Sequence, residues 1–360
     1  MILSIITVFL SLTGLMVLHE FGHFIIAKKY GVKVEEFGLG YPPRLFGKKI
    51  GETLYSVNLI PFGAFVKLFG EEKEVKDKRS FTGRPIWQRA FIVLGGVLSF
   101  WIIAAILLSL VVFIGAPYEI SDEEAGVLRD PRVQIIAVSA NSPAQGAGLQ
   151  VGDTIREIKI ENVEYSGINK VKEVQDILQK GRGKEIILTT ERGNKMIESS
   201  VLSRENPPPE EGAVGIGLAR TAIKSSPWYK APWLGIKATF NTTFLVILGW
   251  YQVIAKLFAA EPTGVQFLGP VGIFDIMRQR SEMGINYYLH FIAIISIYLA
   301  VFNLLPIPAL DGGKLLFLGI EKIKKRPVSP EFEQKITTVF FLLLISLMIL
   351  VTIKDIKRIF

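Results

Sequence analysis

The first 27 residues of the chain form a mainly apolar stretch in which only His19, Glu20 and His23 are ionisable. The stretch is long enough for an α-helix to cross the hydrocarbon core of a bilayer. Ionisable groups inside such a helix are costly, and they are therefore candidates for function. The sequence predicts a transmembrane helix over residues 1–30 that carries a functional cluster.

A cleaved signal peptide is the alternative interpretation of this stretch. A signal peptide begins with a basic segment and has a short apolar core. Here no basic residue precedes the apolar run, and the run continues through both histidines to Ala27 before Lys28 and Lys29. These features favour a helix that stays in the membrane.

His19 and His23 are four positions apart, which places both imidazoles on one face of a helix, one turn apart. Two imidazoles so placed can share one metal ion, usually Zn²⁺. Glu20 lies beside them, where a carboxylate can accept a proton from water, and the three residues match the H-E-x-x-H pattern of metalloproteases. The structural alternative is a pair of histidines on a buried or polar helix face. Because the chain contains no cysteine, any zinc must be held by histidine and carboxylate.

The composition indicates a membrane protein. Hydrophobic residues make up 50% of the chain, and the mean hydropathy is +0.39. These values are high for a soluble protein and indicate several membrane segments. The net charge of +8 is better explained by basic cytoplasmic loops than by nucleic-acid binding, so no nucleic-acid partner is expected.

Charge and hydropathy divide the chain into alternating membrane and soluble parts. Basic loops of membrane proteins tend to lie in the cytoplasm. The basic loops at 28–89 and 322–326 can both lie there only if residues 233–260 do not span the membrane. This topology places both termini outside the cytoplasm. We predict four spans, over residues 1–30, 90–114, 286–321 and 335–354, the third of them broken at Pro306 and Pro308. A cytoplasmic-side, membrane-associated β-region with an amphipathic segment lies between the first two spans, over 31–89. An extracytoplasmic domain over 115–220 and a linker with an interfacial amphipathic helix over 221–285 lie between the second and third spans.

Two of these parts are predicted to contain β-structure. Residues 32–69 are rich in β-branched and aromatic residues, interrupted by glycine and proline, and predict β-hairpins with a turn at 47–51. The free edge of such a sheet can capture an extended peptide, or the region can be an ordinary cytoplasmic loop. In the domain over 115–220, the S-P-A…A-G-L…G-D-x-I run resembles PDZ domains of bacterial envelope proteases, which bind peptides or chain termini.

A catalytic zinc site needs a third protein ligand. The remaining histidine, His290, lies near the outer end of its predicted helix, whereas His19 and His23 lie near the inner end of theirs. Asp311 follows a proline-broken helix and is expected at the same depth as the two histidines. The alternative role for Asp311 is a helix N-cap before Gly312 and Gly313, and the pattern alone does not decide between the two.

The H-E-F-G-H motif in a first transmembrane helix, the later Asn303-Leu-Leu-Pro-Ile-Pro-Ala-Leu-Asp311-Gly-Gly run and the intervening PDZ-like domain resemble the site-2 protease family of intramembrane metalloproteases, in its bacterial RseP-like branch. The resemblance implies a polytopic α-helical membrane protein with about four transmembrane helices, a membrane-associated β-hairpin region and one inserted PDZ domain of α+β type. It further implies His19, His23 and Asp311 as Zn²⁺ ligands, Glu20 as the catalytic carboxylate, Asn303 as a substrate contact, and an edge strand that binds substrate through Gly63, Ala64, Phe65 and Val66.

The family also implies partners and a location. Expected substrates are transmembrane proteins, such as an anti-sigma factor already cut by a site-1 protease, or signal-peptide remnants. A peptide or substrate terminus would bind the PDZ domain, and lipid would surround the spans in a bacterial cytoplasmic (inner) membrane. One departure concerns the second span, where Gly95-Gly96-Val97-Leu98-Ser99 replaces the frequent G-P-x-x-N pattern. Competing hypotheses are an anchored protease acting outside the membrane, a non-catalytic scaffold and a zinc transporter.

Overall fold

The computed structural model describes residues 2–71, 73, 75–123, 129–139, 141–193, 195–208, 211–259, 261 and 268–359. These residues form two compact units. The first unit comprises Met1–Ser109, Pro232–Arg278 and Leu289–Phe360, and the second comprises Leu110–Ala231 and Gln279–Tyr288. The predicted site residues all lie in the first unit.

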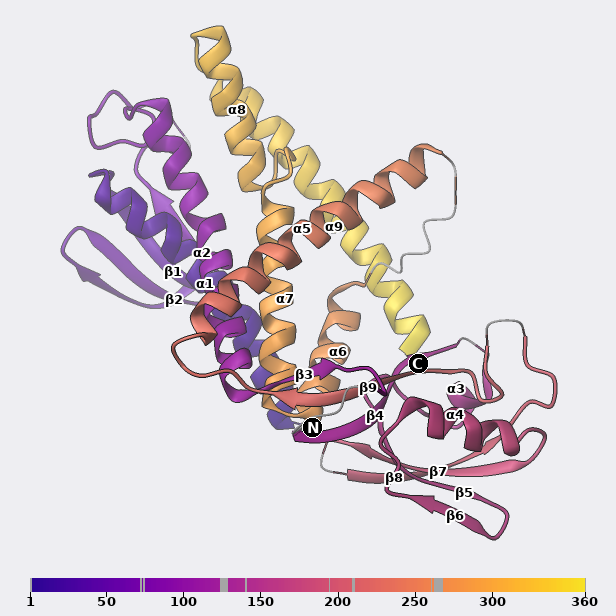
Figure 1. Ribbon diagram of the computed structural model, residues 1–360. Helices are drawn as coiled ribbons and strands as arrows, with labels where there is room; N and C mark the ends of the chain where they lie inside the picture. The colour runs from indigo at the N-terminus through magenta and orange to yellow at the C-terminus, as the bar shows by residue number, and fades with distance from the viewer. Residues whose placement is uncertain are drawn as a thin grey trace. The chain divides into compact units, whose positions relative to one another are not determined.

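Long helices make up most of the first unit (Figure 1). Five helices are long and apolar enough to cross a membrane among the described residues, which agrees with a multi-pass membrane protein. Four of them match the predicted spans, and the fifth, α5, is the segment predicted to lie at the interface. The helices are α1 (Ile2–Lys29), α2 (Ile86–Ile114), α5 (Ala231–Phe258), α6 (Pro270–Met283), α7 (Ile285–Asn303), α8 (Asp311–Lys324) and α9 (Pro330–Ile359).

Helices α1 and α2 approach each other at a pair of glycines. A Cβ atom on Gly22 would lie 2.2 Å from the carbonyl oxygen of Gly95, and a Cβ on Gly95 would lie 2.7 Å from the carbonyl oxygen of Gly22. Small residues allow membrane helices to bring their backbones into contact. The Gly95-Gly96 pair therefore lets α2 pack closely against α1.

The β-region is one long antiparallel hairpin, with β1 over Val34–Ile50, β2 over Thr53–Leu68 and the turn at residues 51–52. Its register shows that the hairpin folds back on itself. Phe37 pairs with Val66 on one side and with Tyr55 on the other. Residues 34–39 therefore form an inner row that lies between the start of β2 and an outer row of residues 64–68. The hairpin lies beside α1 (Figure 1).

The two halves of this hairpin differ in burial. Val34 and Leu68 pack in an apolar cluster with Ala27 of α1 and Val93 of α2. The distal half instead exposes large apolar side chains on both strands, including Leu45, Phe46, Leu59, Ile60 and Phe62.

The chain turns sharply between α7 and α8. Pro306 and Pro308 interrupt the helix, because proline lacks the N–H that a helix interior requires. Two glycines then let α8 start against this turn: a Cβ on Gly312 would lie 2.2 Å from the carbonyl oxygen of Leu305, and one on Gly313 would lie 2.3 Å from that of Ile307. Asp311 is the first residue of α8, and the N-cap position belongs to Leu310. The N-cap role considered for Asp311 is therefore wrong.

The second unit is an α+β domain. Its sheet has the strand order β3-β9-β4-β5-β7-β8, with β6 paired to β5. The elements are β3 (Ala116–Glu119), β4 (Arg129–Val138), α3 (Pro143–Gly146), β5 (Thr154–Ile160), β6 (Val163–Ser166), α4 (Val171–Lys180), β7 (Glu185–Arg192), β8 (Lys195–Leu202) and β9 (Ile216–Lys224).

The segment that follows α2 runs along one edge of β9. Residues Ala116–Glu119 pair with Thr221–Lys224, and the N–H of Ile120 donates to the carbonyl of Arg220 over 2.9 Å. The Asp122 carboxylate then accepts hydrogen bonds from the first N–H groups of α4, at Val171 and Lys172. The chain therefore occupies this part of its own sheet edge.

Candidate metal centre

Three side-chain atoms from α1 and α8 meet at one point. Nε2 of His19 lies 3.3 Å from Nε2 of His23. Oδ2 of Asp311 lies 3.2 Å from the His19 nitrogen and 3.4 Å from the His23 nitrogen. Ligand atoms about 2.0–2.2 Å from a tetrahedral Zn²⁺ are separated by about 3.3–3.5 Å. The spacing of the three atoms fits a shared zinc ion.

The imidazoles are buried and oriented by α2. Nδ1 of His23 donates to the carbonyl oxygen of Ile92 over 2.9 Å, which leaves its Nε2 lone pair for a metal. The ring of His19 stacks on Phe100, with centroids 4.6 Å apart and planes 20° apart. Two residues of α2 thus hold the two rings in place.

Burial makes this cluster costly without a cation. Nδ1 of His19 and Oδ2 of Asp311 are buried and have no well-aligned hydrogen-bond partner, although Oδ2 lies close to both imidazoles. Burying such polar groups without partners costs free energy. A bound cation would compensate the carboxylate, so the donor set and its environment fit zinc.

Gly96 of α2 leaves space for the imidazoles. A Cβ atom on Gly96 would lie 2.2 Å from Nε2 of His23 and 2.8 Å from Cε1 of His19. The sequence patterns did not predict this role of Gly96. The Gly95-Gly96 pair is the sequence signal for this close approach, because the backbones of both glycines lie against Gly22 and Gly96 also faces the imidazoles.

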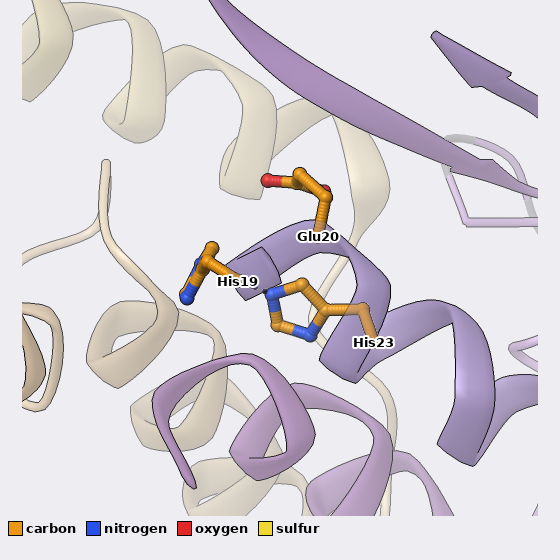
Figure 2. Close-up of side chains that lie close together, drawn as sticks. All are labelled: His19, Glu20 and His23. Atoms are coloured by element: carbon orange, nitrogen blue, oxygen red, sulfur yellow. Dashed lines mark hydrogen bonds between the residues drawn. The ribbon is translucent and has the colours of Figure 1, made fainter. Parts of the chain in front are cut away.

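Glu20 leaves the same turn of α1 on the side of the hairpin (Figure 2). Its Oε2 atom accepts a hydrogen bond from the backbone N–H of Val66 over 3.1 Å. The ligand-capable atoms of His19, Glu20 and His23 lie within 4.8 Å of one another. The carboxylate therefore stands next to the metal position while β2 fixes its orientation.

The predicted edge segment lies beside this carboxylate. Gly63, with φ +75°, precedes the outer row, and the ring of Tyr41 packs over it. Ala64, Phe65 and Val66 pair with Leu39, Gly38 and Phe37 of the inner row. The N–H of Val66 points the other way, toward Glu20, so the second edge of the outer row faces α1.

Asn303 is the last residue of α7, and its side-chain amide donates to the carbonyl of Leu299 over 2.9 Å. This contact lies within its own helix and does not bring Asn303 to the three ligand atoms. His290 is an exposed residue of α7. The structure thus brings together His19, Glu20, His23, Asp311 and Val66.

Sequence reasoning missed two ion pairs that hold α8. Lys314 pairs with Glu71, which follows the hairpin, and Arg89 of α2 makes a two-pronged contact with Glu321. Neither pair has a signal in sequence spacing, because the partners are far apart in the chain. Only the position of Lys314, three residues after Asp311, marked it as a neighbour of the site.

The fold and ligand geometry agree with the comparison to known protein families, in which the model of peptidase family M50 matches residues 7–347. The chain belongs to this site-2 protease family. Like the other M50 members, it is a zinc metalloprotease, and its His-Glu-His group is the expected kind of metal-binding cluster.

Similar M50 proteins span nearly the whole chain. A protein of Clostridium perfringens (strain 13 / Type A) that carries a zinc-metalloprotease name is 34% identical over 356 residues, covering 98% of each chain. The zinc metalloprotease RasP of Shouchella clausii is 29% identical over 431 residues, covering 96% of this chain and 97% of its own. The regulator of sigma-W protease RasP of Bacillus subtilis is 26% identical over 443 residues, covering 100% of both.

Proposed function

We propose that this M50 protease hydrolyses peptide bonds within transmembrane segments of membrane proteins, with His19, His23 and Asp311 as zinc ligands and Glu20 as the catalytic carboxylate. The observation that carries the proposal is the triangle of ligand atoms, 3.2–3.4 Å apart, formed by side chains of α1 and α8. Since α1 is long and apolar enough to cross a membrane, the reaction would occur at membrane depth.

Glu20 is the residue placed to move protons in this reaction. When bound, zinc supplies Lewis-acid chemistry that polarises the scissile carbonyl and makes water more acidic. Glu20 would accept the proton of the attacking water and deliver it to the leaving amine. The hydrogen bond from Val66 would hold the carboxylate toward the site during both transfers.

The outer row of the hairpin would bind the substrate. A transmembrane helix keeps its peptide groups in internal hydrogen bonds, so it must unwind before hydrolysis. An unwound stretch can add as a strand to a free sheet edge. Residues 63–66 would bind this stretch along the edge that faces α1 beside Glu20, so a substrate strand would have to enter between this row and α1. Asn303 is the further substrate contact in this proposal.

For topology we propose four spans in the bacterial cytoplasmic membrane, with both termini and the second unit outside the cytoplasm. The basic loops at 28–89 and 322–326 then both lie inside. In this arrangement α5 lies along the outer interface. Its large apolar side chains are exposed at Trp233, Phe240, Phe244 and Tyr251. Lipid would cover these side chains, as it would cover the exposed apolar residues of the distal hairpin.

We further propose that the second unit is a PDZ domain that binds peptides or trimmed substrate ends. The substrates of the protease would include an anti-sigma factor already cut by a site-1 protease, or signal-peptide remnants. The Bacillus subtilis relative is named as a regulator of sigma-W protease. The segment Ala116–Glu119 already pairs with Thr221–Lys224 of β9. A bound peptide would therefore add along a different part of that edge, or displace this segment.

Cleavage of a membrane reporter tests the proposed function. The reporter carries a soluble tag, one transmembrane helix and a short external tail, and it is co-expressed with wild type or with Glu20→Gln. We expect a cut within the membrane helix with wild type and its loss with Glu20→Gln. Glu52→Gln, which changes a carboxylate at the 51–52 turn that pairs with Lys28 and Arg79, is the control and should cut normally. Equal cleavage by wild type and Glu20→Gln would contradict the proposal.

A further inference from the structure

The outer row of the hairpin is held at two points near the metal centre. At one point, the N–H of Val66 donates to Glu20 of α1 over 3.1 Å. At the other, Glu71 forms an ion pair with Lys314 of α8. Glu71 follows Leu68, the last residue of β2, after three positions. The row is therefore attached both to the helix with Glu20 and to the helix with Asp311.

Glu71 is rigidly connected to the end of the row. Its N–H donates to the carbonyl of Leu68 over 3.3 Å, and the N–H of Phe69 donates to the carbonyl of Lys33 over 2.9 Å. The N–H of Phe81 in turn donates to the carbonyl of Phe69 over 2.7 Å. A shift of Glu71 along the chain direction would have to break these bonds or carry the row with it.

Lys314 is equally fixed relative to the third ligand. It lies three residues after Asp311, a spacing that places both side chains on one face of α8. The start of α8 is packed through Gly312 and Gly313 against the preceding turn, and Thr337 of α9 donates to the carbonyl of Pro308 over 3.1 Å. The Lys314 ammonium group also interacts electrostatically with Asp311 and Glu20.

We propose that Glu71 and Lys314 are positioning residues that hold the register of the outer row, residues 64–68, against the metal centre, and so determine which substrate bond is cut. The inference rests on the proposed binding of substrate to this row. A strand bound to the row can slip only in steps of two residues if it is to keep the same side chains on each face. A loosened row would therefore present bonds two residues away from the normal one.

The test compares cleavage positions by mass spectrometry of the products of the same membrane reporter. Wild type should cut one main bond. Lys314→Met and Glu71→Gln should distribute the cuts over that bond and bonds two residues away, while zinc content stays at the wild-type level. Lys314→Arg keeps the cation and should return cleavage to one bond. A single unchanged bond in Lys314→Met and Glu71→Gln would overturn the inference.

Glu321→Gln is the matched control. It breaks the contact between Arg89 and Glu321, which holds α8 to α2 and does not involve the hairpin. The control should lose stability but keep the single cleavage position. A broadened cleavage pattern in Glu321→Gln equal to that in Lys314→Met would overturn the inference, since any loosening of α8 would then have the same effect.

A second measurement needs no substrate. Amide hydrogen exchange of residues 64–68 reports local opening of the outer row, and we expect it to be about tenfold faster in Lys314→Met than in wild type or Glu321→Gln. Equal exchange in the three proteins would overturn the inference. Persistent cleavage by Glu20→Gln would instead contradict the proposed function and would leave this exchange result unaffected, so the two failures are distinguishable.

Discussion

His23 shows how one neighbouring helix can define a metal ligand. Its Nδ1 atom donates to the carbonyl of Ile92, and its Nε2 atom faces the space that Gly96 leaves open. The first contact fixes the tautomer, and the second prevents a steric clash with the ring. At the residue scale, the ligand set of α1 therefore depends on the backbone of α2.

Gly96→Ala should weaken zinc binding. The added methyl group would lie 2.2 Å from Nε2 of His23, so the ring must move away from the metal position. Overpacking of this kind costs about 1–3 kcal/mol, which corresponds to a loss of zinc affinity of about 5- to 150-fold. Chelator competition on purified protein measures it. Gly319→Ala is the control, since nothing lies within 4 Å of a Cβ there; equal affinities in the two variants would contradict the packing argument.

Asp311→Asn tests whether Asp311 is a metal ligand or only a structural residue. The amide keeps the shape of the side chain but loses the charge that compensates zinc. Loss of an outer contact to a ligand already costs about 10–100-fold in metal affinity, so loss of the ligand charge should cost at least as much. Zinc content after dialysis measures this effect. Asn303→Ala should retain zinc, because the side chain of Asn303 donates to the carbonyl of Leu299 within α7. Full zinc retention in Asp311→Asn would remove Asp311 from the ligand set.

At the scale of elements, local sequence patterns predicted the long helices and the hairpin well. The apolar runs became α1, α2, α7 and α9, and the glycine- and proline-broken segment at 32–69 became a hairpin. The proline break before Asp311 also predicted that this residue, the proposed third ligand, stands at the start of a new helix. These features are local, because chain length, hydropathy and turn residues determine them.

Features that depend on distant partners were not predicted. The double pairing of Phe37 with Val66 and Tyr55, the hydrogen bond from Val66 to Glu20 and the ion pair of Lys314 with Glu71 each join segments that have no shared periodicity. The helix α6 was also missed, because its charged residues hide the apolar face that a helix pattern requires.

The contact between α2 and α8 should carry measurable stability. The side chains of Arg89 and Glu321 are only 9% and 17% exposed. Arg89→Ala would leave the Glu321 carboxylate without its partner, and removal of one member of a buried pair costs about 3–5 kcal/mol. Thermal unfolding in detergent measures the change. Glu161→Gln removes an exposed ion pair with Lys184 in the second unit, and it should shift the midpoint little; similar shifts in both variants would contradict the assignment of a buried pair.

At the scale of the whole molecule, α5 determines the topology. With four spans, the loop after α8 lies in the cytoplasm, whereas a membrane-crossing α5 would place it outside. A reporter fused at Lys325 should therefore report a cytoplasmic location, and a reporter in the second unit, after Ser203, should report the opposite side. An external location at Lys325 would show that α5 crosses the membrane and would replace the four-span proposal.

The three atoms of the proposed metal centre come from α1 and α8, two helices that lie far apart in the sequence. His19 and His23 belong to α1, and Asp311 belongs to α8, which is synthesised much later. During translation, the growing chain has two imidazoles but no carboxylate to complete their triangle. The proposed metal centre is therefore incomplete until α8 has been synthesised, and α1 enters the membrane before the carboxylate that completes its triangle exists.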